Sequence, residues 1–150
     1  MNKTNPRTKH LVTVDAIIIN KSKIALIQRH NEPFKGMWAL PGGFVDENEP
    51  AKHACIREAF EETGLEVTTI KISDEYSSPD RDPRGFTISL VFLCSVKKGT
   101  LKAGDDAKNA QWFSLYNLPP MAFDHKKMID DCLSSAYLAH HIIPDLIRMN

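Results

Sequence analysis

The sequence lacks an excess of charge of either sign. Its 150 residues include 19 lysines and arginines and 19 aspartates and glutamates, so the formal net charge at pH 7 is zero. Proteins that hold a nucleic-acid backbone usually need a positive surface, and the composition supplies no positive excess for one. The balance argues against polymeric DNA or RNA as a substrate, and there is no acidic tail.

Cysteines are few and apolar runs are short. Cys55, Cys94 and Cys132 lie far apart, show no C-x-x-C spacing and leave one cysteine over in any disulfide scheme, which favours a reducing compartment. The N-terminus is polar, and the apolar run at 15–20 is far too short for a signal core or a membrane span. We therefore expect a cytoplasmic protein with no membrane partner.

What remains is the composition of one ordinary folded domain. With 42% hydrophobic and 25% charged residues, a chain of this length can bury a substantial core. No repeat, low-complexity tract or interdomain linker is found in it. We predict a single domain over residues 1–150.

Local patterns predict a mixed sheet covered by two helices. Apolar runs, several of them β-branched, predict strands at 12–19, 24–27, 66–72, 86–96 and 110–115. Turn-like residues at 20–23 suggest a hairpin or two neighbouring strands, and a loop rich in proline and glycine follows from Glu32 to Val45. Pro50 and Gly64 delimit one helix. A second helix is expected from Asp124, as its N-cap, to His140.

The first predicted helix carries an unusual cluster of carboxylates. Successive helical residues are rotated by about 100°, so Glu58, Glu61 and Glu62 share one face within an arc of roughly 100°. Like charges at this spacing repel one another, and a hard divalent cation would remove that repulsion. Magnesium prefers oxygen ligands and commonly shares the phosphates of a substrate. The helix face is therefore predicted to bind Mg²⁺, with Mn²⁺ as the alternative.

Residues before and within the helix support this interpretation. Arg57 can pair with Glu61 one turn along or reach back to Glu49, so it is expected to align carboxylates. Gly43 permits a backbone conformation in which a carbonyl faces the metal cluster. The glutamate pattern alone is more often a solvated surface with salt bridges. The fixed spacing of Gly43, Glu49 and Arg57 favours the metal site instead.

Together these residues resemble the Nudix box, G-x5-E-x7-R-E-U-x-E-E-x-G-U, in which U is apolar. Its fixed positions are filled by Gly43, Glu49, Arg57, Glu58, Glu61, Glu62, Gly64 and Leu65. The first U position holds Ala59, where a larger aliphatic residue is commoner. The resemblance implies an α/β fold of the Nudix type, an α/β/α sandwich with a mixed sheet in which the box forms a loop–helix–loop. It also implies hydrolysis of a nucleoside diphosphate linked to another moiety.

The resemblance further implies roles for individual residues. The metal ligands would be Glu58, Glu61, Glu62 and the carbonyl of Gly43. Glu49 and Arg57 would support them. The general base would be Glu61, Glu58 or a loop carboxylate outside the box, for which Asp106 is the candidate, with a solvated turn as its alternative. Magnesium would bridge the pyrophosphate oxygens and activate a water for attack on phosphorus.

Segments outside the box narrow the substrate. Residues 33–45, 80–85 and 122–125 are similar to the corresponding segments of ADP-ribose pyrophosphatases and of ADP-ribose-handling Nudix domains attached to proteins of NAD metabolism. The candidates for substrate contact are Arg29, Phe34, Trp38, Arg81 and Arg84. The guanidinium groups suit phosphate or ribose oxygens, although those at 80–85 could equally pair with Asp80 and Asp82. The two aromatic rings could stack on adenine or close the core.

These observations give one primary hypothesis and two alternatives. The primary hypothesis is magnesium-dependent hydrolysis of ADP-ribose, or of a related nucleoside diphosphate derivative, to AMP and ribose 5-phosphate. One alternative is a pyrophosphohydrolase of oxidised or noncanonical nucleoside triphosphates. The other is a non-catalytic regulatory domain that binds ADP-ribose. The expected partner is a small-molecule nucleotide, and the sequence leaves a homodimer open.

Overall fold

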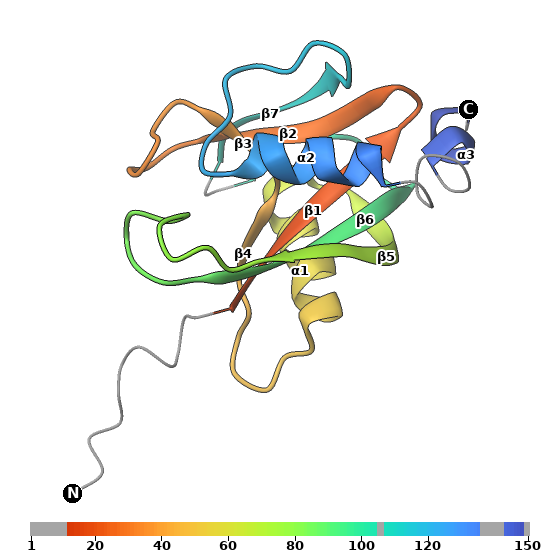
Figure 1. Cartoon of the computed structure of the whole chain (residues 1–150). Coiled ribbons are helices and arrows are strands. Elements are labelled where there is room, and N and C mark those ends of the chain that lie inside the picture. Colours follow the sequence, from red (N-terminus) through yellow and green to blue (C-terminus); the bar gives the residue numbers. More distant parts are fainter. Residues whose placement is uncertain (1–11, 105–106, 136–142, 149–150) are drawn as a thin grey trace, which may run out of the picture.

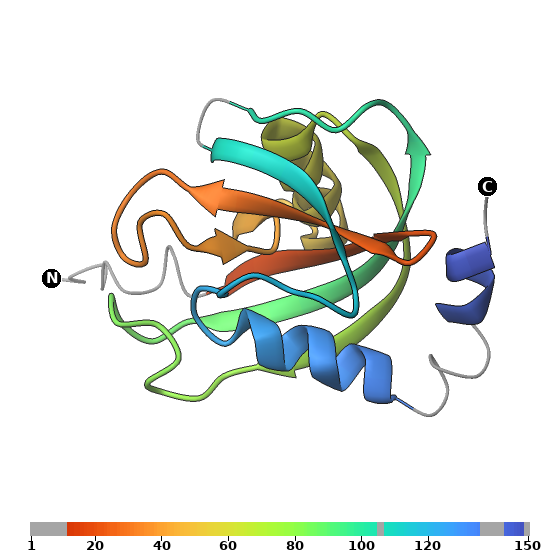
Figure 2. The same cartoon turned by 90° about the horizontal axis from the view of Figure 1, so that it is seen from above.

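The computed structural model describes residues 12–104, 107–135 and 143–148. In this part of the chain, a seven-stranded mixed sheet lies between helix α1 (Ala51–Thr63) and helix α2 (His125–Ser134) (Figure 1). Viewed from above, the two helices lie on opposite sides of the strands (Figure 2). The predicted α/β/α sandwich with a mixed sheet is confirmed.

The strands are β1 (Val12–Asn20), β2 (Lys23–Arg29), β3 (Trp38–Ala39), β4 (Gly42–Phe44), β5 (Glu66–Tyr76), β6 (Ile88–Lys98) and β7 (Ala107–Ser114). The main path of the sheet is β3-β2-β1-β6-β5, with β4 paired to β1 and β7 paired to β2. Strands β1 and β6 run parallel, and the other pairs are antiparallel. Residues 14–19 of β1 are all buried, as expected for a strand covered on both faces.

Strand β1 changes partner along its length, which divides the sheet near the candidate site. Its last residues pair with β2 across the predicted hairpin, at Ile19 and Ile24, whereas residues 13–15 pair with residues 42–44 of β4. The segment 32–45, predicted to be a loop, therefore contains β3 and β4. That prediction was wrong because strands of two or three residues carry too little periodicity to be detected.

The two faces of the sheet are packed with side chains of different size. Alternate residues of β1 point to opposite faces, so one strand contributes to both cores. The core toward α1 includes the small residues Ala16, Ala25, Ala54, Cys55 and Ala59. The core toward α2 includes the larger residues Ile17, Ile19, Leu26, Met128 and Ile129. Small side chains let α1 approach the strands closely, which brings its carboxylates against β4.

Both ends of α1 lie within one residue of the predicted positions. Pro50 is the N-cap residue rather than the first helical residue. Gly64 ends the helix in the left-handed conformation, with φ of 73°, and its N–H donates a 2.9 Å hydrogen bond to the carbonyl of Phe60. Glycine adopts this conformation without the strain that a side chain would add, so the helix stops where the box ends.

Helix α2 begins where predicted but is shorter. It ends at Ser134 because the backbone of Ser135 has left the helical region, with ψ of 120°. The predicted end at His140 was therefore wrong, and a further helix, α3 (Ile143–Arg148), was not predicted. Asp124 occupies the N-cap position, but its side chain makes no capping hydrogen bond; its carboxylate accepts hydrogen bonds from Arg81 instead.

The three cysteines, Cys55, Cys94 and Cys132, are buried and form no disulfide. Within the described ranges, no helix combines the length and the apolar character needed to cross a membrane.

Candidate active site

A cavity of about 350 Å³ lies between the first half of β1, the end of β2 and strand β4. Its walls differ in charge. One wall carries the acidic side chains Asp46, Glu58 and Glu62. Another part of the lining, the basic wall, carries the side chains of Arg29, Arg81 and Arg84, together with Asp82 and the rings of Phe44 and Phe123. Such a cavity suits a negatively charged ligand, which the arginines can bind. A cation would be needed between that ligand and the carboxylates, because their negative charges repel each other.

Two glycines allow β4 to pack closely on both sides. A Cβ atom on Gly43 would lie 2.6 Å from the carboxyl carbon of Glu58 in α1, and one on Gly42 would lie 2.1 Å from the carbonyl oxygen of Val14 in β1. Both distances are shorter than side-chain atoms tolerate. The N–H of Gly42 donates a 3.0 Å hydrogen bond to Oε2 of Glu62. Gly43 therefore leaves room for the Glu58 carboxylate, and Gly42 lets β4 lie close against β1.

Arg57 connects the carboxylates of the box. Its Nε and Nη2 atoms donate to both oxygens of Glu49, at 2.7 and 2.9 Å, and its Nη1 donates to Glu58 at 2.8 Å and to Glu61 at 3.2 Å. Nη2 also donates to the carbonyl of Phe44 at 3.2 Å. The guanidinium holds the pKa of Glu49 down at about 2, against an ordinary value of 4.5. Both pairings expected for Arg57, back to Glu49 and along to Glu61, occur together.

The box glutamates differ in their surroundings. Burial raises the pKa of Glu58, and the nearby Arg57 opposes part of that rise. Glu61 is 54% exposed, does not line the cavity and interacts with Arg57. Among the described residues, no three acidic, histidine or cysteine side chains are gathered closely enough to enclose a metal ion. The donors on the acidic wall are nevertheless all oxygens, the type that Mg²⁺ and Mn²⁺ prefer, and the Gly43 backbone directly adjoins the Glu58 carboxylate.

Of the three arginines of the basic wall, Arg29 has the least negative charge beside it to balance its own. Its Nε donates a 2.6 Å hydrogen bond to the carbonyl of Pro33, and its guanidinium lies 4.9 Å from the centre of the Phe123 ring. Burial and the neighbouring Arg84 lower the pKa of Arg29. No carboxylate within the described ranges forms an ion pair with it. Its charge therefore remains available to an anion in the cavity.

The two arginines of the 80–85 loop are paired with aspartates. Arg81 is 5% exposed and binds both oxygens of Asp124, at 3.0 and 2.9 Å, while its Nη1 donates to Thr87 at 2.5 Å. Arg84 is 47% exposed and binds Asp82 at 3.1 and 2.8 Å. Pairing within the loop was thus expected correctly for Arg84. For Arg81 it was wrong, because its partner lies 43 residues further along the chain.

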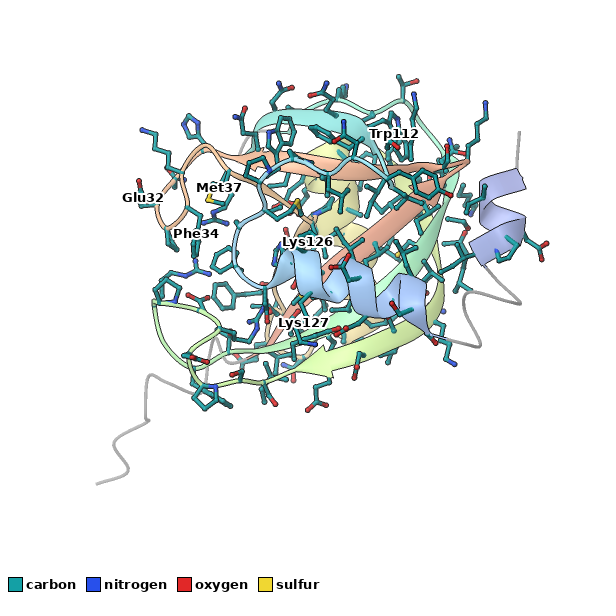
Figure 3. All side chains as sticks on the ribbon, turned by 45° about the horizontal axis from the view of Figure 1, so that its top comes forward. Glu32, Phe34, Met37, Trp112, Lys126 and Lys127 are labelled. Carbon is teal, nitrogen blue, oxygen red and sulfur yellow. The ribbon has the colours of Figure 1, made fainter. Side chains whose placement is uncertain are left out.

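The predicted aromatic contacts lie beside the cavity rather than in its lining. Phe34, on the loop after β2 (Figure 3), packs against Phe123 with ring centres 4.8 Å apart. Trp38 packs against Phe113 at 4.7 Å. The rings that line the cavity, Phe44 and Phe123, were not singled out in the sequence, although both fall in segments similar to ADP-ribose-handling proteins. Asp106 lies outside the described residues, so its role stays a prediction.

A buried polar group at the cavity comprises Asp15, Ser89 and His125. The sequence suggests His125 as a candidate hydrogen-bonding residue at the start of the last helix, but it does not indicate Asp15 or Ser89. The N–H of Leu40 donates a 3.0 Å hydrogen bond to Nδ1 of His125, and Nε2 of the same ring lies 3.5 Å from Oδ1 of Asp15. The hydroxyl of Ser89 donates to Oδ2 of Asp15. Burial lowers the pKa of His125, which favours a neutral ring. The signal in the sequence was a single aspartate before a run of buried isoleucines.

The fold, the box helix and the acidic wall are those of a Nudix protein. The chain belongs to this family, because the family model of the NUDIX domain matches residues 9–132. The ADP-ribose pyrophosphatase of Methanocaldococcus jannaschii is 57% identical over 120 residues, which cover 80% of this chain and 71% of that protein. The ADPR responsive transcriptional repressor NtrR of Acinetobacter baylyi is 31% identical over 133 residues, 83% of this chain and 53% of the repressor. Among solved structures, the NUDIX domain of Shewanella oneidensis NrtR complexed with ADP ribose is 28% identical, with a TM-score of 0.76 over 86% of this chain and 91% of that one.

Proposed function

We propose that this protein hydrolyses the pyrophosphate bond of ADP-ribose, giving AMP and ribose 5-phosphate, and that it requires Mg²⁺ or Mn²⁺. The observation that carries the proposal is that acidic and basic side chains line one cavity. Carboxylates of the box helix line it together with a half-buried arginine, Arg29, that forms no ion pair with a carboxylate in the described ranges. The similarity to a protein named ADP-ribose pyrophosphatase supports the choice of substrate.

The acidic wall would hold the metal. Glu58, Glu62 and the backbone of Gly43 border the cavity, and Glu61 would join them by exchanging its contact with Arg57 for the ion. When bound, the metal neutralises charge on the pyrophosphate oxygens and activates the attacking water. Arg57 fixes the direction of the Glu58 carboxylate through its 2.8 Å hydrogen bond.

Of the two box residues considered as general base, Glu58 is the better situated. Its carboxylate borders the cavity, whereas that of Glu61 is exposed at the side of the helix. We assign it the role of accepting the proton of the attacking water, with Asp106 as the alternative.

The basic wall would bind the diphosphate. Arg29 presents Nη1 and Nη2 without a hydrogen-bond acceptor in the described ranges, and a guanidinium can hold two phosphate oxygens at once. Arg84 is exposed enough to turn from Asp82 toward a ligand. Arg81 is held by Asp124 and Thr87, so its part is to support the wall.

A second candidate function is a sensor that binds ADP-ribose without turnover. The likeness to the repressor NtrR favours it, but this chain spans only about half of that protein. The intact set of box glutamates favours catalysis. We also propose that the chain is one domain over residues 1–150, that it acts in the cytoplasm and that it forms a homodimer.

The decisive experiment follows the products formed from ADP-ribose by the purified protein, with and without Mg²⁺ or Mn²⁺. Release of AMP and ribose 5-phosphate only with metal supports the proposal. Nucleoside triphosphates, including oxidised ones, are tested in parallel, and preferential release of pyrophosphate from them would support the pyrophosphohydrolase. Binding of ADP-ribose by calorimetry with no metal-stimulated product would support the sensor.

A further inference from the structure

A buried carboxylate at the cavity has one oxygen with unused acceptor capacity. The Asp15 side chain is only 9% exposed and lines the cavity from strand β1. One of its oxygens, Oδ2, accepts the hydrogen bond of Ser89. The other, Oδ1, lies 3.5 Å from Nε2 of His125, and no donor in the described ranges makes a hydrogen bond to it. Because Asp15 lines the cavity, a hydroxyl or amide donor of a bound ligand can reach this oxygen.

The neighbours of Asp15 hold it in one orientation. His125 is itself fixed, because its Nδ1 accepts the N–H of Leu40 and its neutral form must then carry the proton on Nε2, toward Asp15. Ser89 fixes the opposite oxygen. A carboxylate held on two sides presents its free acceptor direction without further ordering, and such preorganisation favours ligand binding.

The position of Asp15 in the sheet identifies the part of a ligand that it would meet. Asp15 is paired with Gly42 across β1 and β4, and Gly42 donates its N–H to Glu62 of the acidic wall. The carboxylate is therefore adjacent to where the proposed function puts the metal and the diphosphate. In ADP-ribose, the group bonded directly to the diphosphate on either side is a ribose, and the base lies one sugar further away. A ribose offers hydroxyl donors, which match the acceptor that Asp15 presents.

We propose that Asp15 determines substrate specificity by accepting a hydrogen bond from a ribose hydroxyl of the substrate. This inference rests on the proposed function, because it takes the substrate to be a nucleoside diphosphate sugar. The hydroxyl belongs to either the adenosine ribose or the terminal ribose, and the two are distinguished by experiment. Ser89 and His125 act as positioning residues that hold the carboxylate.

The test compares ADP-ribose with five analogues, each lacking one of its five free ribose hydroxyls, on the wild-type protein and on Asp15→Asn. In the wild type, loss of the contacted hydroxyl should lower kcat/KM by about 10- to 100-fold, the range for a hydrogen bond to a charged group. Asp15→Asn should lower kcat/KM for ADP-ribose by a similar factor. The sensitive analogue should then lose nothing further in the variant, and its identity tells which ribose is bound. Asp74→Asn, an exposed aspartate on β5 that accepts the N–H of Glu75, is the matched control and should behave as wild type.

Ser89→Ala provides a second variant, which keeps the carboxylate and removes the bond that orients it. It should lower kcat/KM for ADP-ribose by roughly 3- to 10-fold and leave that for the sensitive analogue unchanged. This measurement decides the matter if Asp15→Asn does not fold, as judged by circular dichroism.

Three results would overturn the inference while leaving the proposed function intact. The first is a wild-type protein whose kcat/KM is unaffected by the loss of any of the five hydroxyls. The second is an equal proportional loss for ADP-ribose and every analogue in Asp15→Asn. The third is a rise in the Mg²⁺ concentration needed for half-maximal activity in that variant, which would make Asp15 part of the metal site. If the wild type releases no AMP from ADP-ribose, the proposed function fails and the inference fails with it.

Discussion

The acidic and basic walls of the cavity are built in different ways. Most of the acidic wall comes from one continuous stretch, in which a helix is held against a two-glycine strand segment and its carboxylates are linked by Arg57. The basic wall is assembled from β2, the loop at 80–85 and the start of α2. Its arginines differ in how their charge is balanced: Arg81 pairs with Asp124, Arg84 pairs with Asp82, and Arg29 has no carboxylate partner in the described ranges. We infer that the acidic wall determines which reaction is catalysed and that the basic wall determines which ligand binds.

The largest effect is expected from the acidic wall. Glu62→Gln removes a charge from the metal site while keeping the volume of the side chain, and its amide can still accept the N–H of Gly42. Turnover of ADP-ribose should fall by roughly 10²- to 10³-fold, as when a group that stabilises transition-state charge is lost. The melting temperature should stay close to that of the wild type. Wild-type turnover in this variant would contradict the division between the walls.

The next effect concerns stability on the basic side. Arg81→Met leaves the Asp124 carboxylate without the partner that binds both of its oxygens in a largely buried site. The free energy of unfolding should fall by about 3 kcal/mol. Arg84→Met is the control, because its half-exposed pair with Asp82 should contribute no more than about 1 kcal/mol. Urea unfolding measures both, and equal losses would show that burial does not distinguish the two arginines.

A smaller effect should come from the arginine without a carboxylate partner. Arg29→Met retains much of the side-chain length over the Phe123 ring but loses the charge. The kcat/KM for ADP-ribose should fall by about 10- to 30-fold, mostly through a higher KM, as expected for a lost hydrogen bond to a charged group. Exposed Lys23→Met at the other end of β2 serves as control. An unchanged KM in Arg29→Met would remove this residue from substrate binding.

The smallest effect is a dependence of stability on pH that originates in Glu49. The pKa of Glu49 is depressed from 4.5 to about 2 in the folded protein, so its contribution is complete above pH 4.5 and is lost as the pH falls from 4.5 toward 2. The difference in unfolding free energy between wild type and Glu49→Gln should therefore be largest at neutral pH and shrink below pH 4.5. A difference that stays constant down to pH 2.5 would exclude the Arg57 pairing as its cause.

The difference between the acidic wall and the basic wall explains which parts of the candidate site could be predicted from the sequence. The residues of the box lie within 23 positions, and helical rotation alone brings Glu58, Glu61 and Glu62 to one side. The exposed position of Glu61 could not be read from that rotation, because it depends on where β4 lies. Most of the basic wall depends on contacts between distant segments, such as Arg81 with Asp124. No local pattern reports such pairings.

The sequence also could not predict which single residues are buried at the cavity. For Phe34 and Trp38 the sequence allows either stacking on adenine or packing in the core, and in the structure the rings that line the cavity are Phe44 and Phe123. Asp15 was passed over as the edge of an apolar strand. Its significance arises only when Ser89 and His125, from β6 and α2, meet it in the folded molecule.

The missing side chains at Gly42 and Gly43 have a consequence for how this scaffold can be altered. A Cβ atom on Gly42 would meet the β1 backbone and one on Gly43 would meet the Glu58 carboxylate, so mutant libraries that vary these two positions should return mostly inactive clones. Arg84 in the 80–85 loop is 47% exposed, so other side chains have room at its position. New nucleotide preferences should therefore be sought at Arg84, while the glycine pair and the buried Arg81–Asp124 pair are left unchanged.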